Sequence, residues 1–171
     1  MKYRRPSKRD EKRKTIPDRD SQLIKLSLRG EWRSSKIVAR GIKMIEKIKL
    51  RKKLTVVFNK FIRLRDERKG CISCVDGAVE NAGHYHGTGA YPQPSMRFNE
   101  DNVHGQCIYC NMNLEGNRKG YEKGLIKRFG KQILEKLDVQ RSLPQTTWTN
   151  FEFEAMIKNY QQKVKELEKG R

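Results

Sequence analysis

Two Cys-x-x-Cys pairs constrain this chain of 171 residues more than any other feature. Cys71 and Cys74 form the first pair, Cys107 and Cys110 form the second, and 32 residues separate the pairs. Each turn places two thiolates on one side of a tight loop, and two such turns complete the tetrahedral sulfur site that zinc favours. Because protein would fill all four positions, the pattern predicts a structural zinc ion with no position left for a substrate water.

Other uses of paired cysteines fit this chain less well. We expect it in the cytosol of a bacterial host, because no hydrophobic stretch of a signal peptide follows Met1-Lys2-Tyr3-Arg4-Arg5. Disulfides are disfavoured in that compartment. A thioredoxin-like redox pair would need a βαβ pattern around it, and it would have to occur twice. No apolar run approaches the roughly 18 residues of a membrane span, so no membrane partner is expected.

Charge is distributed unevenly along the chain. The formal net charge is +19. Residues 1–69 carry 25 Lys or Arg against 8 Asp or Glu, whereas residues 70–171 carry 14 against 12. A basic block of that density favours a polyanionic partner such as nucleic acid, since each neutralised phosphate releases counterions. A merely solvated charge run is the alternative interpretation.

The sequence pattern divides the chain into four segments. Residues 1–34 form a basic arm, which is helical or disordered. Residues 35–69 carry apolar residues at helical spacing, among them Val38, Ile42 and Phe58, and predict one long basic helix or two. Residues 70–130, rich in Gly, Asn, His and Pro, predict short strands and turns around the zinc, and residues 131–171 predict C-terminal helices.

Local signals mark the helix ends in the last third of the chain. Gly130 follows a helical pattern and predicts its C-terminal stop. Thr149-Asn150-Phe151-Glu152 has the form of a capping box. The helix that it opens would bury a face made of Phe153, Met156 or Ile157, Tyr160, Val164 and Leu167. Since only 35% of the residues are hydrophobic, we predict an α+β fold with a small zinc-bound core flanked by helices.

The stretch between and after the cysteine pairs is rich in side chains that can transfer protons or bind metal ions. It contains all three histidines, His84, His86 and His104, together with several asparagines and acids. Phosphodiester hydrolysis needs these groups, since a neutral imidazole takes a proton from water while oxygen and nitrogen ligands hold a divalent cation. The alternative is that these side chains only satisfy turns and helix caps.

One string of residues carries a family resemblance. It consists of Ala82-Gly83-His84-Tyr85, then Met96-Arg97-Phe98-Asn99-Glu100-Asp101-Asn102-Val103-His104, then Gln106-Cys107-Ile108-Tyr109-Cys110-Asn111, then Gly116-Asn117. The chain from about Leu54 to Leu167 resembles the NinG (Rap) recombination endonucleases of lambda-like phages, which are similar to zinc-stapled HNH nucleases. The resemblance implies a phage or prophage origin and a ββα-metal, treble-clef-like core. It also implies Mg²⁺- or Mn²⁺-dependent cleavage of branched DNA such as Holliday junctions and D-loops.

The same resemblance implies roles for four residues. His84 would be the general base on the first hairpin strand. Asn102 would brace the hairpin loop and orient that histidine. Asn111, directly after the second cysteine pair, would be a metal ligand, and His104 would contact phosphate or metal.

The chain departs from the family pattern in two places. HNH proteins generally carry an Asp ligand immediately before the catalytic His, where this chain has Gly83, and the NinG family tends to carry an acid where this chain has Asn81. Asn81, Glu80 and His86 are therefore the further candidates for the catalytic metal. The lambda-like relatives also carry an extra N-terminal cysteine cluster, which is absent here.

The basic residues on both sides of the core are the expected DNA contacts. Few base-reading side chains accompany them, so selectivity would come from DNA shape. Symmetric cleavage of a junction would suit a homodimer. A non-catalytic zinc module that binds nucleic acid and a basic ribosome-associated zinc protein are the competing interpretations. The expected contacts are Lys47, Lys49, Arg51, Lys52, Lys53, Lys60, Arg63, Arg97, Arg118 and Lys119.

Overall fold

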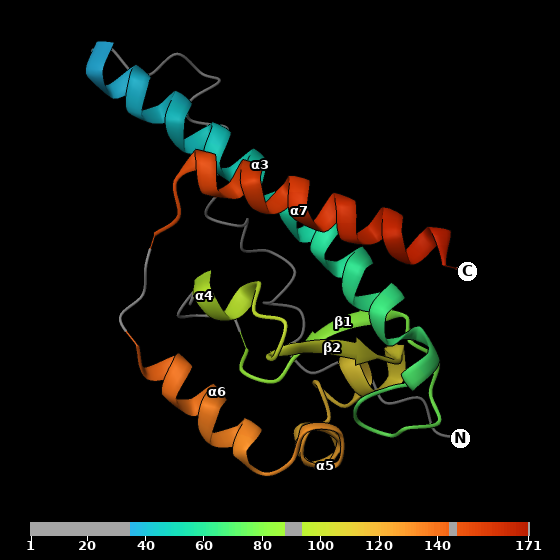
Figure 1. The fold of residues 1–171 in the computed structure, drawn as a ribbon. Helices are drawn as coiled ribbons and strands as arrows, with labels where there is room; N and C mark the ends of the chain where they lie inside the picture. Colours follow the sequence, from blue (N-terminus) through green and yellow to red (C-terminus); the bar gives the residue numbers. More distant parts are fainter. Residues whose placement is uncertain (1–34, 88–93, 144–146, 171) are drawn as a thin grey trace, which may run out of the picture. The chain divides into compact units, whose positions relative to one another are not determined.

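The computed structural model describes residues 35–87, 94–143 and 147–170 (Figure 1). The predicted arm at residues 1–34 lies outside the described residues. The chain divides into two compact units, residues 1–49 and 50–171. Within the described residues, helices surround one two-stranded antiparallel sheet, which confirms the predicted α+β class at that level.

Residues 35–69 form one long helix followed by a short turn. Helix α3 spans Ser35–Asp66, and a 3₁₀ turn covers Glu67–Lys69 before Gly70 turns the chain with a φ of 70°. Val38 and Ile42, two of the apolar residues at helical spacing, are exposed at 40% and 51%. They remain exposed because the apolar cluster to which α3 contributes contains only residues from Leu50 onward.

A hairpin forms the centre of the second unit. Strand β1, Asn81–His84, pairs antiparallel with β2, Val103–Gln106. Asn81 lies opposite Gln106, and His84 lies opposite Val103. Because side chains alternate along a strand, Asn81, Gly83, His104 and Gln106 share one face, and Ala82, His84, Val103 and Gly105 share the other.

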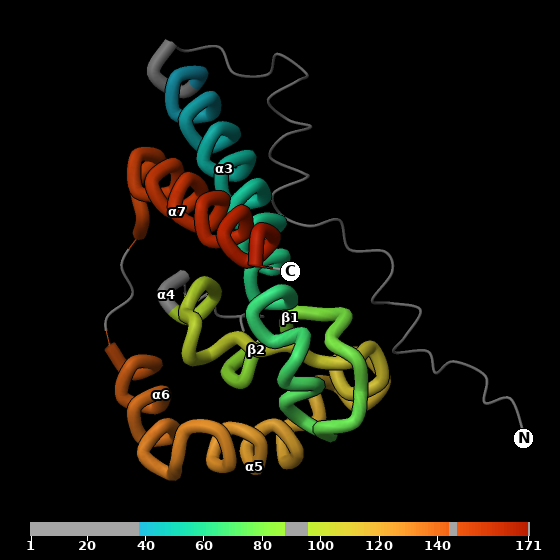
Figure 2. Tube along the Cα trace, turned by 45° about the vertical axis from the view of Figure 1, so that its right-hand side comes forward, coloured from blue at the N-terminus to red at the C-terminus, as the bar shows by residue number. Residues whose placement is uncertain are grey.

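The face of the hairpin that carries Val103 packs against α3 and α7. Helix α7, Asn150–Lys169, begins with the predicted capping box between Thr149 and Glu152. Within the second unit, it lies beside the part of α3 from Leu50 onward (Figures 1 and 2). The shared cluster consists of Leu54, Phe58, Phe61, Ile62, Phe98, Val103, Phe153, Ile157, Tyr160 and Val164.

The other face of the hairpin packs against α5, Arg118–Phe129, which is followed by α6, Gln132–Ser142. Gly130 ends α5 as predicted, with a φ of 81° and its N–H bonded to the carbonyl of Ile126. The short helix α4, Pro94–Arg97, and a π-helical turn, Tyr109–Asn113, complete the elements. In the described part of the chain, no helix has the length and apolar character needed to cross a bilayer.

Candidate metal centre and strand-end site

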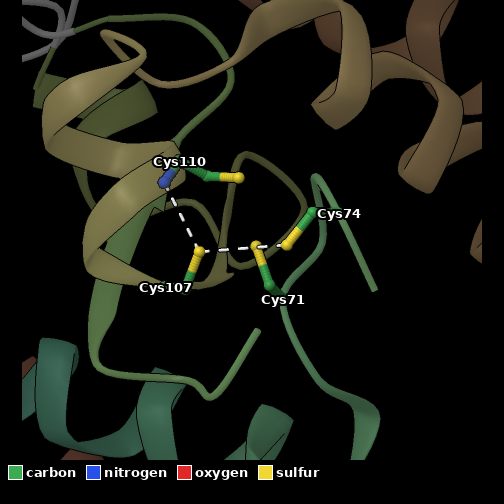
Figure 3. A group of neighbouring side chains, drawn as sticks. All are labelled: Cys71, Cys74, Cys107 and Cys110. Carbon is green, nitrogen blue, oxygen red and sulfur yellow. Dashed lines mark hydrogen bonds between the residues drawn. The ribbon is translucent and has the colours of Figure 1, made fainter. Parts of the chain in front are cut away.

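The four cysteines come together as their spacing predicts. Their sulfur atoms all lie within 4.8 Å of one another, and Figure 3 shows the side chains gathered around one point. Cys74 Sγ and Cys107 Sγ are 3.9 Å apart, close to the separation of about 3.8 Å that zinc–sulfur bonds of 2.3 Å give in a tetrahedron. The group can therefore hold a metal ion such as zinc.

Backbone N–H groups and one glycine support this cysteine group. The N–H of Ser73 donates to Cys71 Sγ and that of Cys110 donates to Cys107 Sγ, both at 3.4 Å. Such bonds stabilise negative charge on sulfur. A Cβ added at Gly77 would lie 2.7 Å from Cys107 Cβ and 2.8 Å from Cys107 Sγ, so only glycine fits there.

Helix α5 packs closely on the first cysteine turn. A Cβ added at Gly124 would overlap the carbonyl of Ile72, and one added at Gly120 would overlap that of Ser73. Asn117 caps α5 through its side-chain oxygen and donates from Nδ2 to Cys110 Sγ at 3.4 Å. The metal centre therefore fixes α5 against the hairpin.

His84 ends β1 with its ring half-buried. Its Nε2 lies 3.0 Å from the carbonyl oxygen of Arg97. A carbonyl can only accept, so Nε2 carries the proton in this bond and Nδ1 is left unprotonated. Burial lowers the pKa of His84 and the Arg97 charge acts the same way, whereas the hydrogen bond opposes them. The ring is therefore neutral at pH 7.

Asn102 is fully buried and fixes the segment that follows β1. Its Oδ1 accepts from the N–H of His86 at 2.8 Å. Its Nδ2 donates to the carbonyls of His86 at 3.1 Å and Met96 at 2.9 Å. The side chain thus joins the two ends of the connection between β1 and α4, close to His84 in the chain.

Gly83, directly before His84, faces two side-chain oxygens. A Cβ added at Gly83 would overlap Gln106 Oε1 and would lie 3.1 Å from Asn111 Oδ1. Asn111 belongs to the turn after the second cysteine pair and is partly exposed. A side chain at position 83 would therefore require the Gln106 amide to move.

His104 lies in the interior, 1% exposed, which differs from its expected contact with phosphate or metal. Its Nδ1 is 3.2 Å from the hydroxyl of Tyr121, which donates to the carbonyl of Gly83 at 2.9 Å. Burial lowers the pKa of His104 to about 3. A neutral ring in this position holds Tyr121, and through it Gly83, in place.

The further candidates for the catalytic metal, Glu80, His86 and Asn81, contact different parts of the molecule. Glu80 Oε2 accepts from the N–H of Ile108 at 3.0 Å and so caps the second cysteine turn. His86 is buried against α6, where Nε2 lies 3.2 Å from Asp138 Oδ1. Its pKa is lowered by burial first, with Arg141 adding to the effect. Asn81 remains beside Gln106 on the face of Gly83.

The expected DNA contacts differ in exposure. Lys60 forms an ion pair with Glu168 at 2.7 Å, and the Arg118 guanidinium lies 4.8 Å from the centre of the Tyr85 ring. Lys47, Arg51, Arg63 and Arg97 are only partly exposed. The exposed members of the set are Lys49, Lys52, Lys53, Lys60, Arg118 and Lys119.

Sequence reasoning gave no role to Gln106 and Tyr121. Gln106 stands immediately before the second cysteine pair, a position that could have drawn attention to it. Tyr121 is 1% exposed and holds the carbonyl of Gly83. Only the fold brings these side chains to the hairpin.

The fold and the cysteine group define a small α+β protein in which two cysteine turns, able to hold a metal ion, join a hairpin to a helix. A family model described as Bacteriophage Lambda NinG protein matches residues 2–170, so this chain belongs to the NinG family. It is 41% identical over 115 residues to Protein ninG of Escherichia phage lambda, covering 66% of this chain and 54% of that relative.

Two further relatives give the same result. Protein ninG of Salmonella phage P22 is 40% identical, and that of Enterobacteria phage H19B is 36% identical, each over 115 residues. These alignments cover 66% of this chain and 55% of each relative, so the chain spans about half the length of the relatives that it matches. No solved structure matches this chain.

Proposed function

We propose that this chain is an HNH-type endonuclease that hydrolyses DNA phosphodiester bonds in branched recombination intermediates with the help of Mg²⁺ or Mn²⁺. The observation that carries the proposal is the bond between His84 Nε2 and the carbonyl of Arg97, at 3.0 Å. It leaves a neutral imidazole at the end of β1, one residue along the chain from Gly83, which the side-chain oxygens of Gln106 and Asn111 approach.

His84 acts as the general base. With its proton on Nε2, Nδ1 accepts a proton from the attacking water, and the positive charge that develops is stabilised by the bond to the Arg97 carbonyl. Its lowered pKa keeps the ring in the base form at neutral pH. Asn102 orients the ring indirectly, because it fixes the segment between β1 and α4.

Asn111 holds the catalytic cation in this proposal. A carboxamide oxygen is a hard ligand that suits Mg²⁺ or Mn²⁺. When bound, such an ion neutralises the charge that develops on the phosphate and the leaving oxygen. Asn111 Oδ1 lies near Gly83, the residue directly before His84. Because Gly83 and His84 belong to opposite faces of the hairpin, a phosphodiester that contacts both groups would lie across the end of β1.

Two further features support an HNH-type nuclease. The order of a hairpin, a cysteine turn and a helix, with a cysteine group that can hold zinc, is the order expected of a zinc-stapled ββα-metal core. Exposed Lys52 and Lys53 on α3, and Arg118 and Lys119 at the start of α5, suit phosphate contacts that read shape rather than sequence.

A cleavage assay tests the proposal. The zinc-loaded chain is incubated with a four-way junction, a D-loop and linear duplex of matched length, with Mg²⁺, with Mn²⁺, or with EDTA added just before the DNA. We expect cleavage of the branched DNA with either metal and none with EDTA. Binding of the junction without cleavage under any of these conditions would refute nuclease activity.

A non-catalytic zinc module that binds nucleic acid is the second candidate. Position 83 is glycine and position 81 is asparagine, so the site around Gly83 and His84 lacks the acid that metal-dependent nucleases of this kind use. Tight junction binding that is unaffected by removing Mg²⁺ or Mn²⁺, with no product, would favour this candidate.

A further inference from the structure

The side-chain amide of Gln106 is held in one orientation. The residue is fully buried, and its Nε2 donates to Ser73 Oγ at 2.6 Å and to the carbonyl of Gly116 at 2.8 Å. Because the Gly116 carbonyl can only accept, the amide nitrogen must face it. Oε1 therefore points away from both partners.

Gln106 Oε1 is a buried acceptor without a hydrogen bond to any residue that the structure describes. A buried carbonyl oxygen without a partner destabilises the folded state, so this position favours a bound donor or cation. It points at Gly83, where a Cβ would overlap it and would lie 3.1 Å from Asn111 Oδ1. Both oxygens therefore lie close to Gly83, and neither can donate a hydrogen bond to the other.

Asn81 adds a third carboxamide. It lies opposite Gln106 in the hairpin register, on the same face as Gly83, and its Nδ2 is also buried without a partner among the described residues. Half a turn of this amide would present oxygen in place of nitrogen. The nearest acid in sequence, Glu80, is engaged with the N–H of Ile108.

No other group of histidine, cysteine or acidic side chains in the described ranges takes this role. Across residues 35–87, 94–143 and 147–170, the four cysteines are the only set of three or more such residues whose ligand atoms converge. A second cation near Gly83 would therefore depend on neutral oxygens.

We propose that Gln106 Oε1 and Asn111 Oδ1, with Asn81 beside them, bind a hard divalent cation over Gly83 without any carboxylate. This inference rests on the proposed function and names the ligands of its cation. Hard cations accept amide carbonyl oxygens, and Mg²⁺ and Mn²⁺ complete their shells with water and substrate phosphate. Gln106 is buried and Asn111 is partly exposed, so the ion would face solvent on the side of Asn111.

This ligand set has a consequence for binding. Because none of the three ligand side chains is negatively charged, the site binds a cation weakly by itself. The DNA phosphodiester supplies the missing negative charge. Cation and DNA should therefore bind cooperatively, each raising the affinity for the other by the same factor. A carboxylate at position 81 would replace part of that contribution and tighten cation binding in the absence of DNA.

The test measures Mn²⁺ binding to the zinc-loaded full chain through the electron paramagnetic resonance signal of free Mn²⁺, without DNA. We expect one weak site in the parent. N81D should bind roughly tenfold more tightly or better. N111A should bind at least about tenfold more weakly. N113A, an exposed asparagine two residues further along, is the matched control and should bind as the parent does.

A fourth variant examines Gln106 itself. Q106M keeps the length of the side chain and removes the oxygen, and it should also lose the Mn²⁺ site. Zinc content and thermal unfolding show whether it folds, and the gain expected of N81D cannot come from misfolding. If N81D or N111A binds Mn²⁺ with the affinity of the parent, the inference is wrong and Oε1 bonds only to a water molecule.

The outcome is separate from that of the cleavage assay. Cleavage by the parent, combined with unchanged Mn²⁺ binding in N81D and N111A, would overturn the ligand assignment and leave the nuclease intact. Mn²⁺ binding that follows the expected order, with no cleavage of any DNA, would establish the cation site and refute the nuclease.

Discussion

Asp66 Oδ2 accepts a hydrogen bond of 2.9 Å from the backbone N–H of Gly105, which ties the end of α3 to the middle of β2. The carboxylate is fully buried and receives two further bonds from the Arg65 guanidinium at 2.8 and 2.9 Å. Burial alone would raise the pKa of Asp66, but Arg65 and the Gly105 N–H outweigh it and lower the pKa to about 2. This contact fixes the position of the C-terminal end of α3 against the hairpin that carries His84.

Replacing Asp66 should therefore destabilise the fold. A pKa lowered from 3.8 to about 2 corresponds to about 2 kcal/mol of stability. Since the folded-state pKa is the lower one, this stabilisation is fully present above about pH 4 and disappears as the pH falls toward 2. D66N should lower the free energy of unfolding by about 2 kcal/mol, equally at pH 6 and pH 8, in urea titrations of the zinc-loaded protein.

D101N is the control for that experiment. Asp101 pairs with Lys136 at the surface, so its loss should cost less than about 1 kcal/mol. A D66N protein as stable as D101N would show that the Asp66 contact contributes little.

The cysteine group should hold the metal that organises the fold. Cys74 is exposed, so C74S removes one ligand without opening a cavity in the interior. We expect about one zinc per chain in the parent and a marked loss in C74S, with a lower unfolding temperature, because metal binding and folding are coupled. Metal analysis and thermal unfolding measure both effects. D76S, in the same turn, should keep its zinc, and a zinc-free C74S with the stability of the parent would contradict a structural role.

Helix α5 should tolerate no side chain where it meets the first cysteine turn. A Cβ at Gly124 would overlap the backbone carbonyl of Ile72, so G124A must push the helix away, at a cost of about 1–3 kcal/mol. Gly41 in α3 has no atom within 4 Å of an added Cβ, so G41A should be neutral or stabilising by up to about 1 kcal/mol. Equal urea midpoints for the two variants would contradict the placement of α5.

Features encoded by neighbouring residues were predictable from the sequence. The capping box of Thr149 and Glu152 and the stop at Gly130 depend on residues three or four positions apart, and both are confirmed. The convergence of the cysteines followed from their spacing, because two tight turns that each carry two thiolates are typical of a single tetrahedral zinc site.

The interior of the site could not be predicted in the same way. The sequence indicated that His104 contacts phosphate or metal, but Tyr121 and Phe129 of α5 cover its ring. Their positions depend on how the whole helix packs against the hairpin. The role of Gln106 depends equally on distant partners, since Ser73 and Gly116 fix its amide. A linear pattern shows which groups are present and does not show which of them are buried.

The sharpest prediction concerns His84. H84A should lower the cleavage rate by about 10²–10⁴-fold, the range typical for loss of a general base, while zinc content and junction binding stay close to those of the parent. In the proposed function, binding depends on exposed basic side chains such as Lys52 and Arg118, which the substitution leaves unchanged. Added imidazole should restore part of the activity, because it can supply the missing base.

The pH profile distinguishes a base from a structural residue. Burial lowers the pKa of His84, so the parent rate should rise with pH with a midpoint below the ordinary histidine value of 6.5, and H84A should lose this rise. H104Q is the comparison, since His104 is buried and neutral and should affect folding stability more than the pH profile. If H84A cuts at the parent rate, then His84 is not the base, and its bond to the Arg97 carbonyl only stabilises the end of the strand.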